Sequence, residues 1–233
     1  MPIQPIEPRR LYLQIADQIR ALIARGEFPP GTRLPAEREL AKRFGVSRPS
    51  LREALIALEV EGHVDVRPGS GILVTAPGSA GSASADVEGP LEILRARSLI
   101  EGEIAAEAAS LITANEIASL ERILLAMEAP ASPPRSLLLS DREFHLTIAS
   151  SLKNKVLLRM VTDLFDQRDS PLARQFALHF DSPQTWHAVL EEHRQILAAL
   201  AARNPEQSRK AMHDHLRHAH NRWVGELENQ ERG

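Results

Sequence analysis

Histidines and one well-placed aspartate are the side chains of this sequence best suited to chemistry. Asp141 and His145 lie four residues apart, so they would share one face of a helix. His193 lies on a later segment, and the last part of the chain carries four more histidines, namely His213, His215, His218 and His220. A carboxylate and imidazoles that converge from three helices have the form of a divalent-metal site.

Two plainer interpretations stay open at this point. Asp141 and His145 could be an ordinary pair on a helix surface. The histidines near the end of the chain could belong to a solvated face, and this is what we expect for His213, His218 and His220.

Helical periodicity runs through the whole part of the chain that carries these residues. Glycine becomes rare after Leu91, and proline or asparagine marks the breaks between segments. Because no segment here has the alternation of a strand, we expect an antiparallel helical bundle. Asn154 could line a ligand pocket, but its place at the start of a helix favours capping. The predicted helices span residues 91–111, 114–128, 136–150, 154–168, 170–179, 183–202 and 205–228.

The N-terminal part has a different pattern, in which an amphipathic helix at 9–25 precedes two short helices. The first short helix ends at Gly45, and the second, at 48–61, begins after Ser47, a good N-cap residue. Apolar residues at helical spacing along the second helix would pack inward. This is the pattern of a helix-turn-helix.

A β-hairpin follows the two short helices. β-Branched and alternating residues at 63–67 and 72–75 flank a Pro-Gly-Ser-Gly turn. A hairpin after a helix-turn-helix forms a wing, so we predict a winged helix-turn-helix over residues 1–76. The Gly/Ser/Ala-rich stretch 77–90 is a predicted linker, and 91–228 a predicted helical effector-binding and dimerisation domain. The expected fold class is therefore mainly α.

Basic and small polar side chains gather near the start of the second short helix and on the wing. We expect Arg48 and Arg52 to read bases or phosphates and Arg38 to hold the DNA backbone, while Gly69 enters the minor groove. The full predicted DNA-binding set is Arg38, Ser47, Arg48, Ser50, Arg52, Arg67 and Gly69.

Charge is not spread evenly along the 233 residues. The net charge is −3, yet residues 1–76 hold 11 basic against 9 acidic side chains, and the remainder holds 17 against 22. A basic DNA-binding face must therefore be local. The sequence has no cysteine, which excludes disulfides and thiolate chemistry, and no long apolar run or signal peptide. We expect a cytoplasmic protein that does not contact a membrane.

The segment LPAERELAKRFGVSRPSLREALIALEVEGHVDVRPGSGILV resembles the DNA-binding domain of the GntR family of bacterial transcription regulators. Two residues depart from the commonest pattern of that family. Ala36 stands where a capping serine is frequent, which weakens a cap by about 1 kcal/mol. Pro49 stands where a threonine often donates to a phosphate, so one DNA contact is lost.

The segments DREFHLTIA, EEHRQILAAL and AMHDHLRHA resemble the all-helical FCD effector domain of the FadR-type branch of the same family. The resemblance implies a divalent-metal site, with zinc the metal we expect and nickel or manganese the alternatives. The implied ligands are Asp141, His145, His193 and His215.

The segment LRARSLIEGEIAAEAA resembles the first helix of that effector domain, where an arginine lies four residues before a glutamate. Arg97 would grip an effector carboxylate in a bidentate fork, unless it only pairs with Glu101 at the surface. The run LFDQRDSPL is similar to members that sense hexuronates, which adds Arg168 and Ser170 as candidates. The predicted effector-binding residues are Arg97, Glu101, Asn154 and Arg168.

Together these patterns predict a ligand-responsive transcription regulator, most simply a repressor. We expect a homodimer that binds a near-palindromic operator in double-stranded DNA and senses a small carboxylate such as a sugar acid. The sequence leaves open whether ligand releases or strengthens DNA binding. The alternative is a metal-dependent hydrolase built on the Asp/His cluster, but no H-E-x-x-H motif supplies a base, so we do not expect an enzyme.

Overall fold

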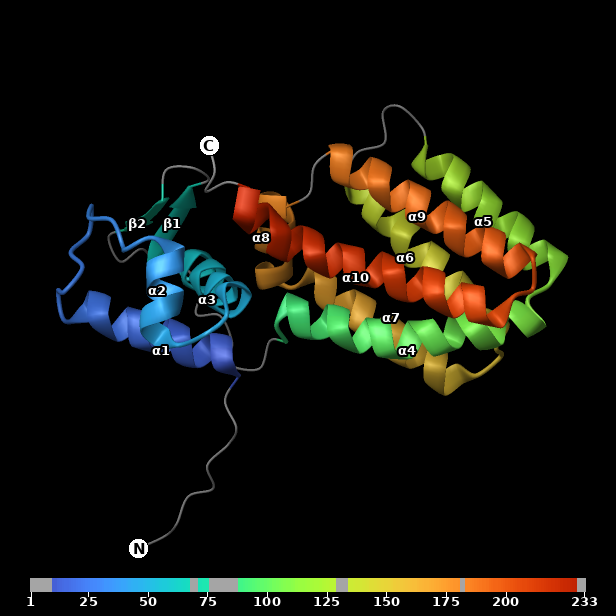
Figure 1. Ribbon diagram of the computed structural model, residues 1–233, viewed down its shortest axis with the longest axis horizontal. Coiled ribbons are helices and arrows are strands. Elements are labelled where there is room, and N and C mark those ends of the chain that lie inside the picture. The colour runs from blue at the N-terminus through green and yellow to red at the C-terminus, as the bar shows by residue number, and fades with distance from the viewer. Residues whose placement is uncertain (1–9, 68–70, 76–87, 129–133, 181–182, 230–233) are drawn as a thin grey trace, which may run out of the picture. The chain divides into compact units, whose positions relative to one another are not determined.

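The computed structural model describes residues 10–67, 71–75, 88–128, 134–180 and 183–229 (Figure 1). Two compact units divide the chain. The first runs to Gly89 and also includes Pro171–Phe176 and the chain from Val224 onward. The second comprises Pro90–Ser170 and Ala177–Trp223.

The first unit is a winged helix-turn-helix, as predicted. Its elements are helices α1 (Leu11–Ala24), α2 (Glu37–Phe44) and α3 (Arg48–Val60), and strands β1 (Val64–Arg67) and β2 (Gly71–Val74). Helix α2 ends at Gly45, whose φ of 66° is the left-handed conformation that glycine adopts without strain. Helix α3 begins after Ser47, whose side chain accepts a hydrogen bond from the backbone N–H of Ser50. Both predicted helix boundaries are confirmed.

Ala36 precedes α2 and makes no side-chain cap, as its residue type requires. Strands β1 and β2 pair antiparallel, with Val64 opposite Val74 and Val66 opposite Ile72. These four side chains are buried, and β1 lies against α3. The wing is therefore held to the helices by packing as well as by its own ladder.

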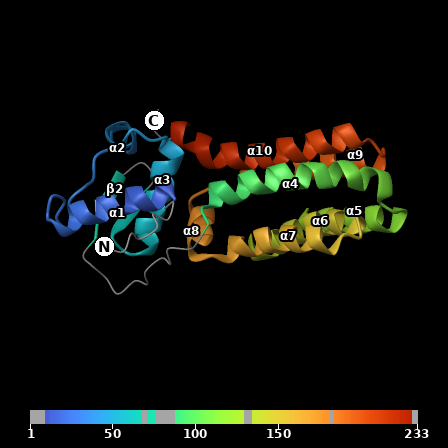
Figure 2. The same ribbon diagram turned by 90° about the horizontal axis from the view of Figure 1, so that it is seen from below.

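The second unit is a set of long helices, which confirms the mainly α fold class. It contains α4 (Pro90–Leu111), α5 (Ala114–Met127), α6 (Pro134–Ser151), α7 (Lys155–Asp166), the 3-10 turn η1 (Gln167–Asp169), α9 (Pro183–Ala201) and most of α10 (Pro205–Asn229). Helix α8 (Pro171–Phe180) is divided between the two units. Figures 1 and 2 both show α4 and α10 side by side.

An apolar core joins α4, α5, α6, α7, α9 and α10. Phe144 of α6, Phe165 of α7 and Ile196 of α9 are among its buried members. Several charged or polar residues are buried beside this core, and most of the predicted metal-binding and effector-binding residues are among them. Among the described residues, no helix combines the length and apolar character needed to cross a membrane.

Candidate functional site

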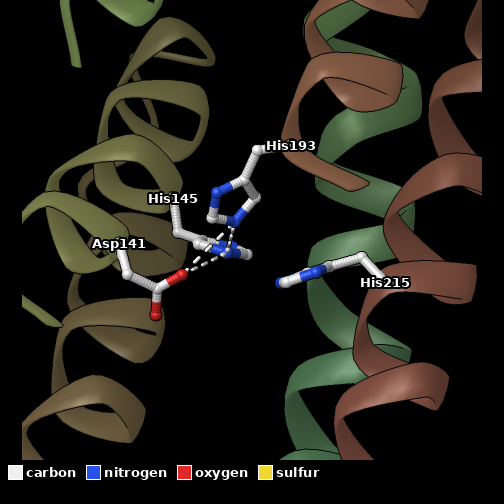
Figure 3. A group of neighbouring side chains, drawn as sticks. All are labelled: Asp141, His145, His193 and His215. Atoms are coloured by element: carbon white, nitrogen blue, oxygen red, sulfur yellow. Dashed lines mark hydrogen bonds and ion pairs between the residues drawn. The ribbon is translucent and has the colours of Figure 1, made fainter. Parts of the chain in front are cut away.

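The four predicted metal ligands meet inside the second unit. Helix α6 supplies Asp141 and His145 one turn apart, α9 supplies His193, and α10 supplies His215. Figure 3 shows the α6 side chains facing the two histidines from the opposite side. All four are buried, and one ligand atom from each lies within 4.8 Å of the others. The surface-pair interpretation of Asp141 and His145 is therefore wrong.

The distances among Asp141, His145 and His193 suit one small cation. His193 Nε2 lies 3.3 Å from Asp141 Oδ1 and 3.4 Å from His145 Nε2, and His145 Nε2 lies 3.7 Å from the same oxygen. Donors held about 2.0–2.1 Å from a tetrahedral ion are about 3.3 Å apart. A set of three imidazoles and one carboxylate is also one that zinc, nickel and manganese accept. The residues present therefore fit a divalent metal.

Two carboxylates orient two of the imidazoles. Glu101 of α4 hydrogen-bonds to Nδ1 of His145, and Glu192 of α9 hydrogen-bonds to Nδ1 of His215 at 2.8 Å. In each ring this leaves Nε2 as the nitrogen available to the cluster. Nδ1 of His193 is buried and has no hydrogen-bond partner among the described residues.

For Asp141, His193 and His215, the protonation states expected at neutral pH are those that bind a metal. Burial would raise the pKa of Asp141, but the charge of Arg168 and the hydrogen bond with His193 hold it well below its usual range. Burial would also raise the pKa of Glu101, but the charge of Arg97 and the hydrogen bond with His145 lower it to about 2.

For two of the buried imidazoles, those of His193 and His215, the pKa shifts in the direction that keeps the ring neutral. Burial lowers the pKa of His193 despite its hydrogen bond with Asp141. Burial likewise lowers the pKa of His215 to about 3, although Glu192 opposes that shift. Ionised carboxylates and neutral imidazoles are the forms in which these side chains ligate metals.

Two arginines lie next to the cluster. Arg97 is 2% exposed, and its Nε donates to Glu101 Oε1 at 2.7 Å, while its Nη2 has no hydrogen-bond partner among the described residues. Arg168, in η1, donates to Asp141 Oδ2. The guanidinium carbons of Arg97 and Arg168 lie 3.8 Å and 5.7 Å from the ring centroid of Phe165. The Arg97–Glu101 pair is thus buried rather than the surface salt bridge that the sequence left open.

Asn154 lies elsewhere. It is exposed and caps α7, accepting hydrogen bonds from the backbone N–H groups of Val156 and Leu157 at 3.0 and 3.3 Å. The capping role that the sequence favoured is therefore confirmed. Ser170, the weaker candidate, is partly buried and ends η1 with a backbone hydrogen bond to Gln167.

Two histidines correct the prediction of a solvated face, since His213 and His220 are both partly buried. His213 is partly buried, with Nδ1 3.1 Å from Ser98 Oγ of α4. A Cβ at Gly102 would lie 2.5 Å from Nε2 of His213, so the missing side chain makes room for the ring. The isolated glycine in a long helix was the signal for this close approach. His218 is exposed, as expected, and His220 is partly buried.

The predicted DNA-binding residues of the first unit differ in exposure. Arg38 and Arg67 are exposed, and Arg67 pairs with Asp65 of its own strand at 2.7 Å. Arg48 is partly buried at the start of α3. Ser47 and Ser50 form the cap of that helix, with their hydroxyl oxygens 2.8 Å apart. Gly69 lies outside the described residues.

Arg52 is less exposed than expected for a side chain predicted to read bases or phosphates. Its side chain is buried, and Nη1 donates to Glu37 Oε1 of α2 at 2.7 Å. The guanidinium therefore links the two helices of the helix-turn-helix. A contact between Arg52 and DNA would require this ion pair to open.

Two protein families match the chain. Residues 11–74 match the bacterial regulatory proteins of the gntR family, and residues 92–218 match the FCD domain. The chain is 38% identical over 219 residues to the Exu regulon transcriptional regulator of Escherichia coli (strain K12), which covers 90% of this chain and 83% of the relative. It is 36% identical over 225 residues to the Uxu operon transcriptional regulator of the same strain, with 93% and 88% covered.

A solved structure has the same architecture. A GntR family transcriptional regulator from Pseudomonas syringae pv. tomato str. DC3000 aligns with a TM-score of 0.50 and 25% identity, over 99% of this chain and 91% of that one. These relatives are regulators rather than enzymes, and they give no support to the hydrolase alternative. The chain belongs to the GntR family of bacterial regulatory proteins and is a DNA-binding transcriptional regulator with an FCD domain.

Proposed function

We propose that the FCD domain of this regulator senses a small hydroxylated carboxylate, of the sugar-acid type, at a divalent-metal centre. The observation that carries the proposal is a complete, buried set of metal ligands beside an arginine whose Nη2 has no partner among the described residues. Asp141, His145, His193 and His215 would hold the ion. When bound, a divalent metal supplies positive charge and open coordination positions to a carboxylate and a neighbouring hydroxyl.

Arg97 is the residue best suited to recognise the carboxylate. A buried guanidinium with an unused N–H group is costly unless an acceptor reaches it. Its Nε and its position are already fixed by Glu101, so only the outer edge of the guanidinium is available to a ligand. Charge-assisted hydrogen bonds of this kind are the strongest that a carboxylate makes.

Arg168 can add a second contact. It is partly exposed and lies on the short η1 turn, where it pairs with Asp141. Arg168 belongs to the segment LFDQRDSPL, and the resemblance of this segment to hexuronate-sensing proteins supports a sugar acid as the ligand. The identity to the Exu and Uxu regulators supports the same ligand class.

On the DNA side, we propose that two chains pair and present two α3 helices to successive major grooves of a near-palindromic operator. Arg48, at the start of α3, would contact base edges, and the exposed Arg38 would contact phosphate. Ligand binding at the metal centre would change the packing of the helices around it, and thereby the spacing of the paired recognition helices. Repression relieved by ligand is the simplest outcome.

The test is a thermal-shift panel on metal-loaded protein with uronates, aldonates and lactate. The right ligand at 100 times its dissociation constant should stabilise the protein by about 2.7 kcal/mol. The shift should disappear with a chelator and in Arg97→Met, each compared with the same protein without ligand. Arg95→Met, an exposed arginine on the same helix, is the matched control and should keep the full shift. A shift that survives both chelation and Arg97→Met would place the ligand elsewhere and refute the proposal.

A further inference from the structure

Glu192 gathers three side chains of α10 onto one carboxylate. It accepts from His215 Nδ1 at 2.8 Å and from His218 Nδ1 at 3.1 Å. Arg222 donates to both of its oxygens, from Nη1 at 2.7 Å and from Nη2 at 3.2 Å. The α10 residues lie about one turn apart, so they face α9 along one stripe.

The side chains that make these contacts differ in their exposure to solvent. The side chain of Glu192 is 12% exposed and that of His215 is 5% exposed, whereas the side chain of His218 is 48% exposed. Arg222 is 18% exposed and forms a two-pronged ion pair. An exposed histidine contributes little to such a group, but a bidentate arginine fixes both position and charge of a carboxylate.

We propose that Glu192 is the positioning residue for the metal ligand His215, and that Arg222 holds Glu192 in place for that role. The inference rests on the metal centre proposed above, and it adds an outer layer to that centre. With its Nδ1–H engaged by Glu192, the imidazole of His215 can present only Nε2 to the ion, in one orientation.

Comparison of the three imidazoles supports this assignment. His145 has its own orienting carboxylate, Glu101, which pairs with Arg97 through one nitrogen, whereas Glu192 pairs with Arg222 through two. Two hydrogen-bonded series of side chains therefore flank the metal centre. In each series an arginine pairs with a glutamate, and that glutamate accepts a hydrogen bond from a histidine. His193 lacks such a partner at Nδ1 among the described residues. Its ring is instead held by stacking on Phe144, with centroids 4.4 Å apart.

The electrostatics agree with a charged, hydrogen-bond-accepting Glu192. The hydrogen bonds that Glu192 accepts from His215 and Arg222 favour its charged form. A carboxylate that stays ionised raises the basicity of the imidazole that it orients, and so strengthens the bond from that imidazole to a metal.

Glu192 also ties α9 to α10, so a purely structural role has to be distinguished. A structural tie would lower the melting temperature of the metal-free and metal-loaded protein alike. It would leave the metal affinity of the folded protein and the spectrum of the bound ion unchanged. A positioning role would change both the metal affinity and the spectrum of the bound ion.

The experiment measures zinc affinity by chelator competition, at a temperature where every variant is folded, together with the visible absorption spectrum of the cobalt(II) form. Glu192→Gln keeps the side-chain shape but loses the charge, and should weaken zinc binding at least about tenfold. The cobalt spectrum should shift, because the orientation and basicity of one imidazole change. Glu191→Gln is the matched control. This neighbour is 58% exposed and pairs only with Arg194 among the described residues, so it should bind zinc as the parent does.

Arg222→Met is the second variant, for the case in which Glu192→Gln does not fold. It leaves Glu192 and His215 in place, so a smaller loss of zinc affinity is expected. Unchanged affinity and an unchanged cobalt spectrum in the folded variants would overturn the inference, even if their melting temperatures fall. Failure of the parent protein to bind zinc or cobalt at all would instead refute the proposed metal centre.

Discussion

Glu101→Gln is the substitution for which the structure predicts the largest combined effect. The two oxygens of Glu101 accept from two different donors, Arg97 Nε and His145 Nδ1. Glutamine has one acceptor oxygen and one NH2 group, so it can serve only one of them. The other donor then faces an NH2 group in a site where both Arg97 and Glu101 are 2% exposed.

Removing one partner of a buried ion pair costs about 3–5 kcal/mol. For a protein of 150–250 residues, each kcal/mol lowers the melting temperature by about 2–4 °C, so we expect a fall of about 6–20 °C. A second consequence concerns the metal. If the glutamine NH2 group donates to Nδ1 of His145, the imidazole proton moves to Nε2, and that nitrogen can no longer ligate.

The measurements are urea denaturation of the metal-free protein and zinc content after dialysis. Glu103→Gln, on the same helix, is the control. Its side chain is 64% exposed and pairs with Arg209, so its stability should change by no more than about 0.5 kcal/mol. The double variant Arg97→Met, Glu101→Met should regain part of the lost stability, because apolar side chains replace both charges while Nδ1 of His145 still lacks its acceptor. A loss below about 1 kcal/mol in Glu101→Gln, with full zinc content, would refute the reasoning.

Three further predictions concern DNA, metal and acid. Arg48→Ala should weaken operator binding by about 1–3 kcal/mol in a gel shift, whereas Arg38→Ala should lower the salt dependence of binding by about one unit of slope. Purified protein should carry close to one divalent ion per chain by elemental analysis, and the double variant His145→Ala, His193→Ala should carry none. Burial lowers the pKa of His215 to about 3, whereas a histidine in the unfolded chain has a pKa of about 6.5. Between these two pH values the unfolded state therefore binds a proton that the folded state does not. Stability of the metal-free protein should therefore fall as pH falls through this range, by up to about 1.4 kcal/mol per pH unit, as urea midpoints at about pH 7, 6 and 5 would record.

Each of these has a clear contrary result. Unchanged DNA binding in both arginine variants, with folding intact, would contradict the proposed DNA contacts of Arg48 and Arg38. A full metal load in the double histidine variant would move the metal site. A urea midpoint that is constant or rises toward acid pH would show that His215 is not held neutral by burial.

Local signals in the sequence were sufficient for the elements and for most of their ends. Gly45 ends α2 because a left-handed residue is needed there, and Ser47 begins α3 because its hydroxyl accepts from the helix N-terminus. Asn154 was likewise predictable as a cap. The four metal ligands could be named because the i, i+4 spacing and the resemblance both pointed to them. These features depend on neighbours in sequence or on side-chain type, and a single sequence is sufficient to show both.

Tertiary structure decided which charged side chains are buried and what they contact. Arg52 looks like a reading residue in the sequence, yet it pairs with Glu37 fifteen positions away. The role of Glu192 could not be predicted from its place next to His193, because adjacent residues on a helix point in different directions. That role arises only where α10 meets α9. The exposure of a polar side chain depends on how helices distant in sequence pack, and neither helical periodicity nor residue type specifies that packing.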